Sequence, residues 1–162
     1  MLNSAFWENT RVLITGNTGF KGTWLSLWLN KLGANIHGYA LHPVTSPNLH
    51  DACRTDNRIQ TTYADIRDYD QLNQVVSEFK PEVVFHLAAQ PLVLDSYDEP
   101  RYTFEVNVQG TLNLLESLRS NDSLKAINII TTDKVYRNNN LNTAFQEHDP
   151  LGGDDPYSAS KA

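Results

Sequence analysis

The chain has 162 residues, of which 40% are hydrophobic and 20% charged, and its formal net charge is -6. This size and balance are typical of one globular domain with a sizeable core. The negative charge and the lack of a basic run argue against nucleic acid as a partner. No apolar run approaches the roughly 18 residues of a membrane span, and the first residues lack the plan of a signal peptide, so we expect a cytoplasmic protein without membrane contact.

The single cysteine, Cys53, cannot form an internal disulfide. No group of Cys and His residues has the spacing of a zinc site. We therefore expect neither a disulfide nor a bound metal.

Short apolar runs alternate with helical patterns along the chain. The predicted strands are 11–15, 35–40, 58–65, 82–89 and 125–131, and the predicted helices are 21–34, 68–79, 99–120 and one that begins at Pro156. In helix 21–34 we expect Trp24 and Trp28 on the apolar stripe, and segment 42–57 is the most loop-like. Strands that alternate with helices indicate an α/β fold, a Rossmann-type doubly wound parallel sheet with helices on both faces.

A glycine pattern follows the first predicted strand and opens the first helix. It reads TGNTGFKG and places Gly16, Gly19 and Gly22 at intervals of three. In a strand-to-helix turn these positions allow a tight turn, close approach of a pyrophosphate, and close helix packing, while the helix N-terminus offers amide hydrogens. A bare glycine pattern could be a turn, but this context favours dinucleotide binding.

The acidic residue that usually grips the ribose about 20 residues later is missing. At the end of strand 35–40 the chain reads Ala40, Leu41 and His42. The residues alone therefore leave NAD and NADP open, and because no arginine stands there to attract a 2′-phosphate, we favour NAD.

Tyr157 and Lys161 are four residues apart, which places them on one face of the last predicted helix. An ammonium near a phenol lowers the pKa of the tyrosine, so that it can act as a base. Alone, this spacing more often means two packed surface residues. Together with the glycine loop it favours catalysis.

Six stretches together carry a family resemblance: TGNTGFKG, ADIRD, FHLAAQPLV, EVNVQGTLNLLE, TTDKVY and DPYSASK. They resemble the extended short-chain dehydrogenase/reductase superfamily and, within it, the nucleotide-sugar 4,6-dehydratases, most of all those acting on CDP-glucose. The resemblance runs from about Phe6 to the last residue. It implies NAD as cofactor, a nucleotide-sugar substrate and a homodimer.

The resemblance also implies that residues 1–162 are the NAD-binding Rossmann portion of a longer enzyme, because family members continue into a C-terminal substrate domain. We expect this piece alone to be inactive. The cofactor residues it implies are Gly16, Gly19, Phe20, Gly22, Asp65, Ile66, Leu87, Ala88, Ala89, Asn107, Tyr157 and Lys161. The alternatives are that Asp65 caps a turn, that residues 87–89 are core packing, and that Asn107 lies on the surface.

For catalysis, the resemblance implies that Tyr157 takes the proton of the sugar C4 hydroxyl during oxidation, while Lys161 holds the phenolate. Thr132 would bind the C4 oxygen. Asp133 would then act as acid at C6 and Lys134 as base at C5, if poor solvation shifts their pKa values. Many family members carry glutamate at the position of Lys134, which could instead recognise a phosphate or the keto oxygen. A sugar 4-epimerase and a non-catalytic dinucleotide-binding module remain alternatives.

Overall fold

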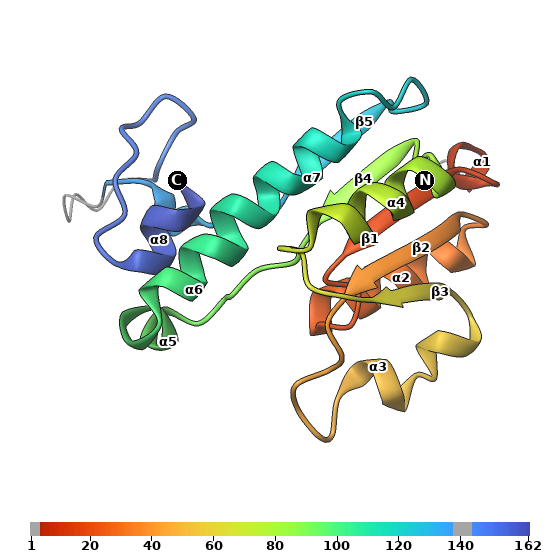
Figure 1. Cartoon of the computed structure of the whole chain (residues 1–162), viewed down its shortest axis with the longest axis horizontal. Coiled ribbons are helices and arrows are strands. Elements are labelled where there is room, and N and C mark those ends of the chain that lie inside the picture. The colour runs from red at the N-terminus through yellow and green to blue at the C-terminus, as the bar shows by residue number, and fades with distance from the viewer. Residues whose placement is uncertain (1–3, 138–143) are drawn as a thin grey trace.

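The computed structural model describes residues 4–137 and 144–162. Its centre is a five-stranded parallel sheet with the strand order β3-β2-β1-β4-β5 (Figure 1). The strands are β1 (Arg11–Thr15), β2 (Asn35–Ala40), β3 (Gln60–Tyr63), β4 (Val83–His86) and β5 (Ala126–Ile129). The α-helices are α1 (Ser4–Trp7), α2 (Phe20–Lys31), α3 (Leu49–Ala52), α4 (Tyr69–Phe79), α5 (Val93–Asp98), α6 (Pro100–Phe104), α7 (Gly110–Leu118) and α8 (Pro156–Lys161). Short 3-10 helices are η1 (Thr55–Asn57) and η3 (Asp133–Val135), and η2 (Glu105–Gln109) is a π-helical turn.

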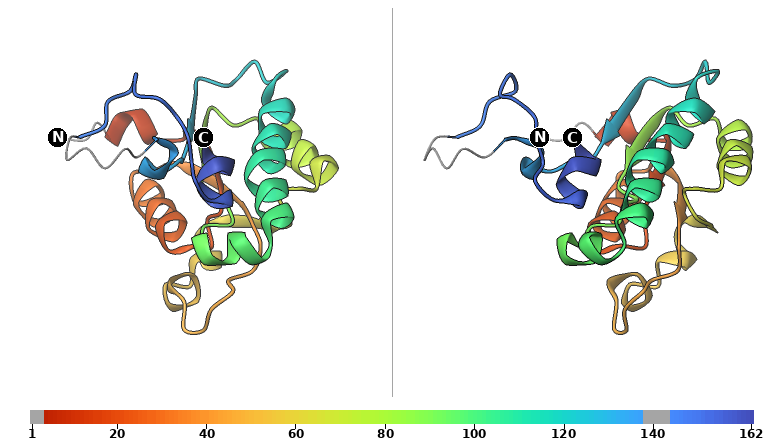
Figure 2. Two further views of the ribbon diagram at one scale, coloured as in Figure 1. Left: turned by 90° about the vertical axis from the view of Figure 1, so that its left-hand side faces the viewer. Right: turned by 60° about the vertical axis from the view of Figure 1, so that its left-hand side comes forward.

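Helices cover both faces of the sheet, as predicted (Figures 1 and 2). Strand β1 explains why: its side chains alternate between two buried clusters. Leu13 belongs to the cluster under α4 and α7, whereas Val12 and Ile14 belong to the cluster under α2. All three are 0% exposed. The first strand in the sequence is therefore the centre of the core.

Local signals set several boundaries. Asp68 accepts a hydrogen bond from the backbone N–H of Gln71 and so caps α4. Asp155 caps α8 in the same way, and Pro156 occupies its first turn. Both helices begin where the sequence predicts.

One expectation about the first βα unit is wrong. Trp24 and Trp28 are 57% and 50% exposed, and α2 buries Gly22, Thr23, Ser26 and Leu29 instead. Small residues face the sheet because the helix packs close to the glycine loop, and the bulky rings turn outward. Segment 42–57, the most loop-like part of the sequence, contains the short helices α3 and η1.

The order of the strands places a switch point beside β1. The chain builds β2 and β3 on one side of β1 and then crosses to β4 and β5 on the other. In open α/β sheets ligands bind at such a point, beyond the carboxyl ends of the strands. Within residues 4–137 and 144–162, no helix is long and apolar enough to cross a membrane.

Candidate active site

The turn after β1 needs glycine at two places. Gly16 has φ +72°, and a Cβ there would lie 2.7 Å from the backbone nitrogen of Ala88. A Cβ on Gly22 would collide with the carbonyl oxygen of Gly16. The first glycine therefore lets β1 and β4 approach at their ends, and the third lets α2 pack on the loop.

Gly19 differs from these two because the protein leaves space beside it. A Cβ there would meet only the carbonyl oxygen of Gly16, at 3.4 Å. Gly19 is the N-cap of α2, and no side chain caps this helix end. The first-turn amides are thus open to an anionic ligand, and the cradle fits a pyrophosphate that accepts their hydrogen bonds.

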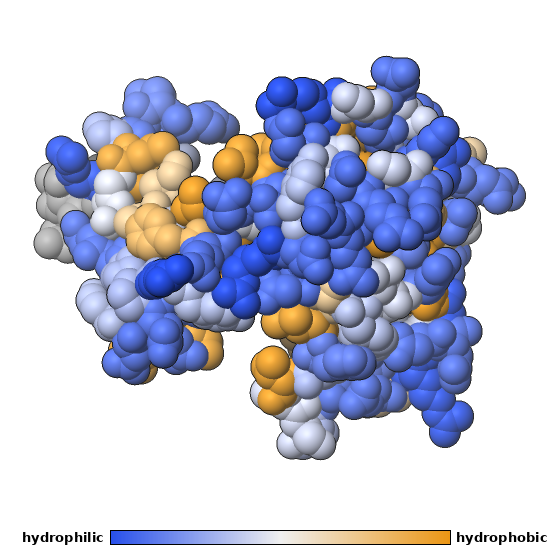
Figure 3. All heavy atoms as spheres, viewed as in Figure 1, coloured by the Kyte–Doolittle hydropathy of each residue, from blue (hydrophilic) through white to orange (hydrophobic). Residues whose placement is uncertain are grey.

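A cleft of about 730 Å³ lies at the switch point. It is within the roughly 300–1,000 Å³ usual for cofactor and ligand sites. Figure 3 shows this side of the molecule hollowed between the segment after β2 and helices α5 and α6. The predicted cofactor residues that line it are Gly16, Gly19, Phe20, Asp65, Ile66, Leu87, Ala88 and Ala89. Residues 87–89 therefore form a wall of the cleft, and Leu87 and Ala88 also pack against the core.

Asp65 lines the cleft and also holds the turn after β3. Its Oδ1 accepts the backbone N–H of Arg67 at 2.9 Å, and its Oδ2 pairs with the guanidinium at 2.8 Å. Hydrogen bonds from Arg67 lower the pKa of this carboxyl. Arg67 also pairs with Glu105 at 3.0 Å, which ties this side of the cleft to η2.

Asn107 is buried at 3% exposure, so the alternative of a surface asparagine is wrong. Its Oδ1 accepts the backbone N–H of Gln90 at 2.9 Å, and its Nδ2 donates to the carbonyl of Gln90 at 3.2 Å. The same Nδ2 donates to Ser160 Oγ at 2.8 Å. Since Gln90 lines the cleft and Ser160 lies on α8, Asn107 fixes that helix to the edge of the cleft. It does so from a π-helical turn, a feature often found at functional sites.

Beneath this edge, His86 joins β1 to α7. Thr15 Oγ1 accepts the N–H of Ala88 at 3.2 Å, so its own hydrogen can go to His86 Nδ1, 2.6 Å away. His86 Nε2 then carries the proton and donates to Thr111 Oγ1 at 2.9 Å. Thr111 donates in turn to the carbonyl of Asn107 at 2.6 Å. Burial, with the charge of Lys161 adding to it, lowers the pKa of His86 to about 4.

Helix α8 carries Tyr157 and Lys161, both partly buried. The backbone N–H of Tyr157 donates to Ser96 Oγ on α5 at 3.1 Å, and its carbonyl accepts from Ser160 at 2.7 Å. Burial lowers the pKa of the Lys161 ammonium. The pair is therefore held by bonds to its own helix, to α5 and, through Ser160, to Asn107.

The turn η3 lies against α8. Thr132 caps it, accepting the backbone N–H of Lys134 at 3.3 Å, and its hydroxyl donates to Asp133 at 3.2 Å. Burial acts to raise the pKa of Asp155, but hydrogen bonds from Ser158 and from the backbone of Tyr157, with the charge of Lys134, outweigh it and lower that pKa. Asp133 and Lys134 are exposed, so the described residues do not supply the poor solvation that their acid and base roles require.

Comparison with known proteins agrees with this geometry. The model of the family described as GDP-mannose 4,6 dehydratase matches residues 13–162. The chain belongs to this family. The family's members lie in the nucleotide-sugar dehydratase and epimerase branch of the extended short-chain dehydrogenase/reductase superfamily.

Individual relatives are of both kinds. A CDP-glucose 4,6-dehydratase of Salmonella typhimurium is 47% identical over 161 residues, covering 99% of this chain and 45% of the relative. A UDP-glucose 4-epimerase of Mycolicibacterium smegmatis is 37% identical, covering 93% and 48%. The chain thus spans less than half the length of these two relatives.

Solved structures of the branch share the fold. The UDP-glucose 4-epimerase of Thermus thermophilus, in complex with NAD, is 30% identical with a TM-score of 0.80, covering 94% of this chain and 47% of that one. The UDP-glucose 4-epimerase of Thermotoga maritima, with UDP-glucose, is 25% identical with a TM-score of 0.82, covering 94% and 48%.

The family's sequence motifs do not by themselves identify Gln90, Ser160 and His86 as parts of the site. Gln90 and Ser160 stand inside the AAQPLV and DPYSASK stretches, where a polar residue within an otherwise apolar or small run is the available signal. His86 stands inside the apolar run of β4, and a histidine there indicates a buried hydrogen-bonded group. Which partners they meet depends on tertiary contacts that no local pattern contains.

Proposed function

We propose that the protein binds NAD and dehydrates a nucleotide-glucose, CDP-glucose in the first place, to the 4-keto-6-deoxy sugar. The observation that carries the proposal is the cleft at the switch point, whose edge is tied through Asn107 to the helix of Tyr157 and Lys161. The 47% identity to a CDP-glucose 4,6-dehydratase supports the choice of substrate.

Within this proposal the chain is the NAD-binding portion of the enzyme, and a further domain completes the binding site for the sugar nucleotide. The share of the relatives that it spans, 45% and 48%, supports this. When bound, NAD supplies a nicotinamide that takes hydride from the sugar C4 and returns it at C6. Gly16, Gly19 and the first turn of α2 would hold the pyrophosphate.

Tyr157, as a phenolate that the ammonium of Lys161 stabilises, takes the proton of the C4 hydroxyl and becomes a neutral phenol. The oxidised C4 makes the C5 proton acidic, because the carbanion delocalises into the ketone. Lys134 removes that proton, and Asp133 protonates the departing C6 hydroxyl. Thr132 orients the C4 oxygen. The contact between η3 and α8 supports the grouping of these five residues, and we infer that bound substrate desolvates Asp133 and Lys134.

The test uses the protein at its natural length, incubated with CDP-, UDP-, GDP- and dTDP-glucose. The alkaline absorbance of 4-keto sugars and the loss of one water from the product mass should appear with CDP-glucose first. Tyr157→Phe should abolish both signals, whereas Tyr69→Phe, at a tyrosine on α4 outside the cleft lining, should not. Absence of a dehydrated product with every nucleotide-glucose would refute the proposal.

The role of Lys134 needs its own measurement. Exchange of the C5 hydrogen for deuterium in the 4-keto intermediate should fall in Lys134→Ala. Exchange at the rate of the unaltered enzyme would instead assign Lys134 to recognition of a phosphate or the keto oxygen.

A 4-epimerase is the second candidate, because epimerases stand among both the sequence relatives and the solved structures. It would share the cleft and the pair Tyr157 and Lys161. It would not use Asp133 and Lys134 as acid and base, and its product would keep the mass of the substrate.

We also propose that the protein forms a homodimer through the long helical face of α6, η2 and α7. Phe104, Val108, Leu112 and Leu115 recur every three or four residues there and are 42%, 47%, 53% and 39% exposed. A contiguous apolar stripe of this kind supports an interface between two copies.

A further inference from the structure

The carboxyl end of β2 raises a question that the proposed function leaves open. A carboxylate usually stands there and grips the adenosine ribose of a dinucleotide. In this chain Leu41 and His42 follow the strand, and both line the cleft. No hydrogen bond among the described residues engages the ring of His42, so both of its nitrogens are available to a ligand.

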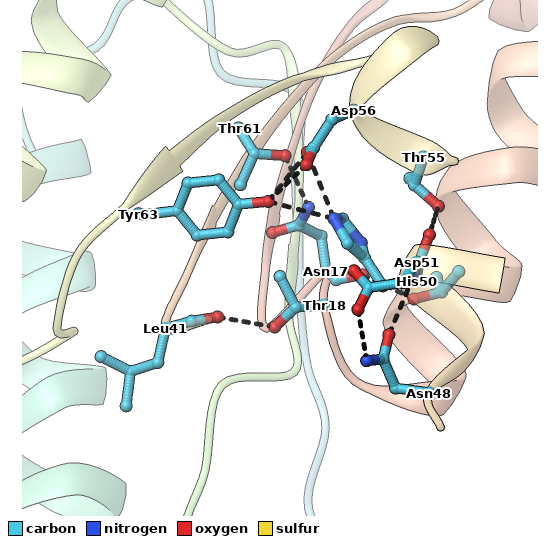
Figure 4. A network of polar contacts seen from close by, with 11 residues as sticks. Asn17, Thr18, Leu41, Asn48, His50, Asp51, Thr55, Asp56, Thr61 and Tyr63 are labelled. Atoms are coloured by element: carbon cyan, nitrogen blue, oxygen red, sulfur yellow. Dashed lines mark hydrogen bonds and ion pairs between the residues drawn. The ribbon is translucent and has the colours of Figure 1, made fainter. Parts of the chain in front are cut away.

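Two hydrogen bonds tie the glycine loop to the ends of its neighbours, one to the backbone before His42 and one to β3 (Figure 4). Thr18 donates from its hydroxyl to the carbonyl of Leu41 at 2.8 Å, and Asn17 donates to Thr61 Oγ1 on β3 at 2.9 Å. Asn17 is 0% exposed and lies directly beneath Gly38, where a side chain would collide with it. The end of β2 is therefore fixed relative to the loop that would hold the pyrophosphate.

The ring of His42 is fixed as well, because it stacks on Tyr63. The two ring centres are 4.0 Å apart and the planes differ by 9°. Figure 4 shows how Tyr63 is held from its other end: its hydroxyl donates to Asp56, with oxygens at 2.7 and 2.9 Å, and His50 Nε2 lies 3.1 Å from the same hydroxyl. Burial, with the hydrogen bond to Asp56 next, raises the pKa of Tyr63 to about 12, so it remains a neutral phenol. Segment 49–57 thus holds in place the ring of Tyr63, on which His42 stacks.

The charges around the cleft are one-sided. Among the described residues that line it, none is lysine or arginine, and the carboxylates are those of Asp65 and Asp95. Asp65 is already paired with Arg67. No cation therefore stands ready for a 2′-phosphate, and no carboxylate at the end of β2 repels one.

We propose that His42 is the specificity-determining residue for the adenosine ribose, and that Tyr63 is its positioning residue. The imidazole hydrogen-bonds the ribose hydroxyls in the place of the usual carboxylate, on a ring platform held by Asp56 and His50. This inference rests on the proposed binding of NAD. An imidazole does not repel a 2′-phosphate as a carboxylate would, but it also does not supply the cation that would bind one. NAD is therefore preferred over NADP by a narrow margin.

The test measures dissociation constants for NAD and NADP by calorimetry with the protein at its natural length. We expect a preference for NAD of no more than about tenfold in the unaltered protein. His42→Asp should widen it by at least about tenfold, because a carboxylate accepts from the ribose hydroxyls and repels the phosphate. His42→Arg should reverse the preference. His148→Ala, at an exposed histidine outside the cleft lining, should leave both constants unchanged.

The role of Tyr63 is tested by non-additivity. His42→Ala and Tyr63→Leu should each weaken NAD binding about fivefold, and the double variant should weaken it no further, since both remove one interaction. Tyr63→Phe keeps the stacking ring and should retain most of the affinity. A purely structural role for Tyr63 would give additive losses. Should Tyr63→Leu not fold, the ratio in His42→Asp and the affinity of Tyr63→Phe carry the test.

The outcomes separate the two proposals. Binding of neither dinucleotide by the unaltered protein overturns the proposed function and this inference with it. Binding of NAD with an unchanged ratio in His42→Asp and His42→Arg overturns the inference alone.

Discussion

Acid should weaken the fold through His86, and the size of the effect follows from its environment. This side chain is 0% exposed and has a folded-state pKa of about 4, against 6.5 as the ordinary value. The unfolded chain therefore binds a proton that the folded chain rejects between pH 6.5 and 4. The free energy of unfolding should fall as the pH drops through that window, and a shift of roughly 2.5 units corresponds to about 3 kcal/mol.

Urea unfolding at several pH values between 7 and 4 measures the effect. His86→Gln keeps an amide that can bridge Thr15 and Thr111 but cannot titrate, so its stability should decline less over the same range. His37, whose pKa is also lowered by burial, contributes in the same direction, and His37→Gln shows its share separately. Carboxylates with lowered pKa values are common to all three proteins and cancel in the differences. Parallel declines for the unaltered protein and His86→Gln would refute the reasoning.

Three further predictions concern the site and the surface. Gly22→Ala should lower the free energy of unfolding by more than about 2 kcal/mol, because its Cβ meets backbone atoms. Gly19→Ala should change that free energy by under about 1 kcal/mol and weaken NAD binding instead. Equal losses of stability in urea would contradict this prediction. Asn107→Ala should lower the free energy of unfolding by about 2–5 kcal/mol and also lower kcat, because it leaves both backbone groups of Gln90 unpaired. The control Asn113→Ala frees the carbonyls of Ile66 and Arg67 and should lower stability with kcat retained. An unchanged kcat in Asn107→Ala would exclude a positioning role. Leu112→Glu should convert the dimer to a monomer in light scattering, and Leu151→Glu, at a leucine of the same 53% exposure, should not; monomers in both or neither would argue against the proposed face.

The sequence predicts the fold well where boundary residues, such as glycines and helix caps, agree with the apolar period. Strands β1 and β2 begin and end where the runs 11–15 and 35–40 do, because glycine follows one and precedes the other. Helix α4 begins one residue after its capping Asp68. The glycine loop, with its strand before and helix after, predicts one wall of the cleft, whereas Asp65, Ile66 and residues 87–89 are expected there only from the family resemblance.

Where tertiary packing decides, the sequence is a weaker guide. The exposed Trp24 and Trp28 contradict their apolar period, because the first turns of α2 lie close to the loop and bury the small residues Gly22, Thr23 and Ser26 instead. Helix 99–120 contains a π-helical turn that no propensity signals, and it turns Asn107 toward Gln90 and Ser160. The roles of Thr132, Asp133 and Lys134 stay predictions, since the structure shows their position beside α8 and not their environment with substrate bound.

The position of β1 also bears on how the chain reaches this structure. Its partners are β2, where Arg11 pairs with Asn35, and β4, where Val12 pairs with Val83. The first pairing closes a short loop, whereas the second must wait for a segment made some 70 residues later. During synthesis α2 can cover the Val12 and Ile14 side of the strand early, but the edge that pairs with β4 stays open until the ribosome has released the middle of the chain. In this interval the open edge can pair with a strand of another nascent chain, so protection from aggregation matters most then.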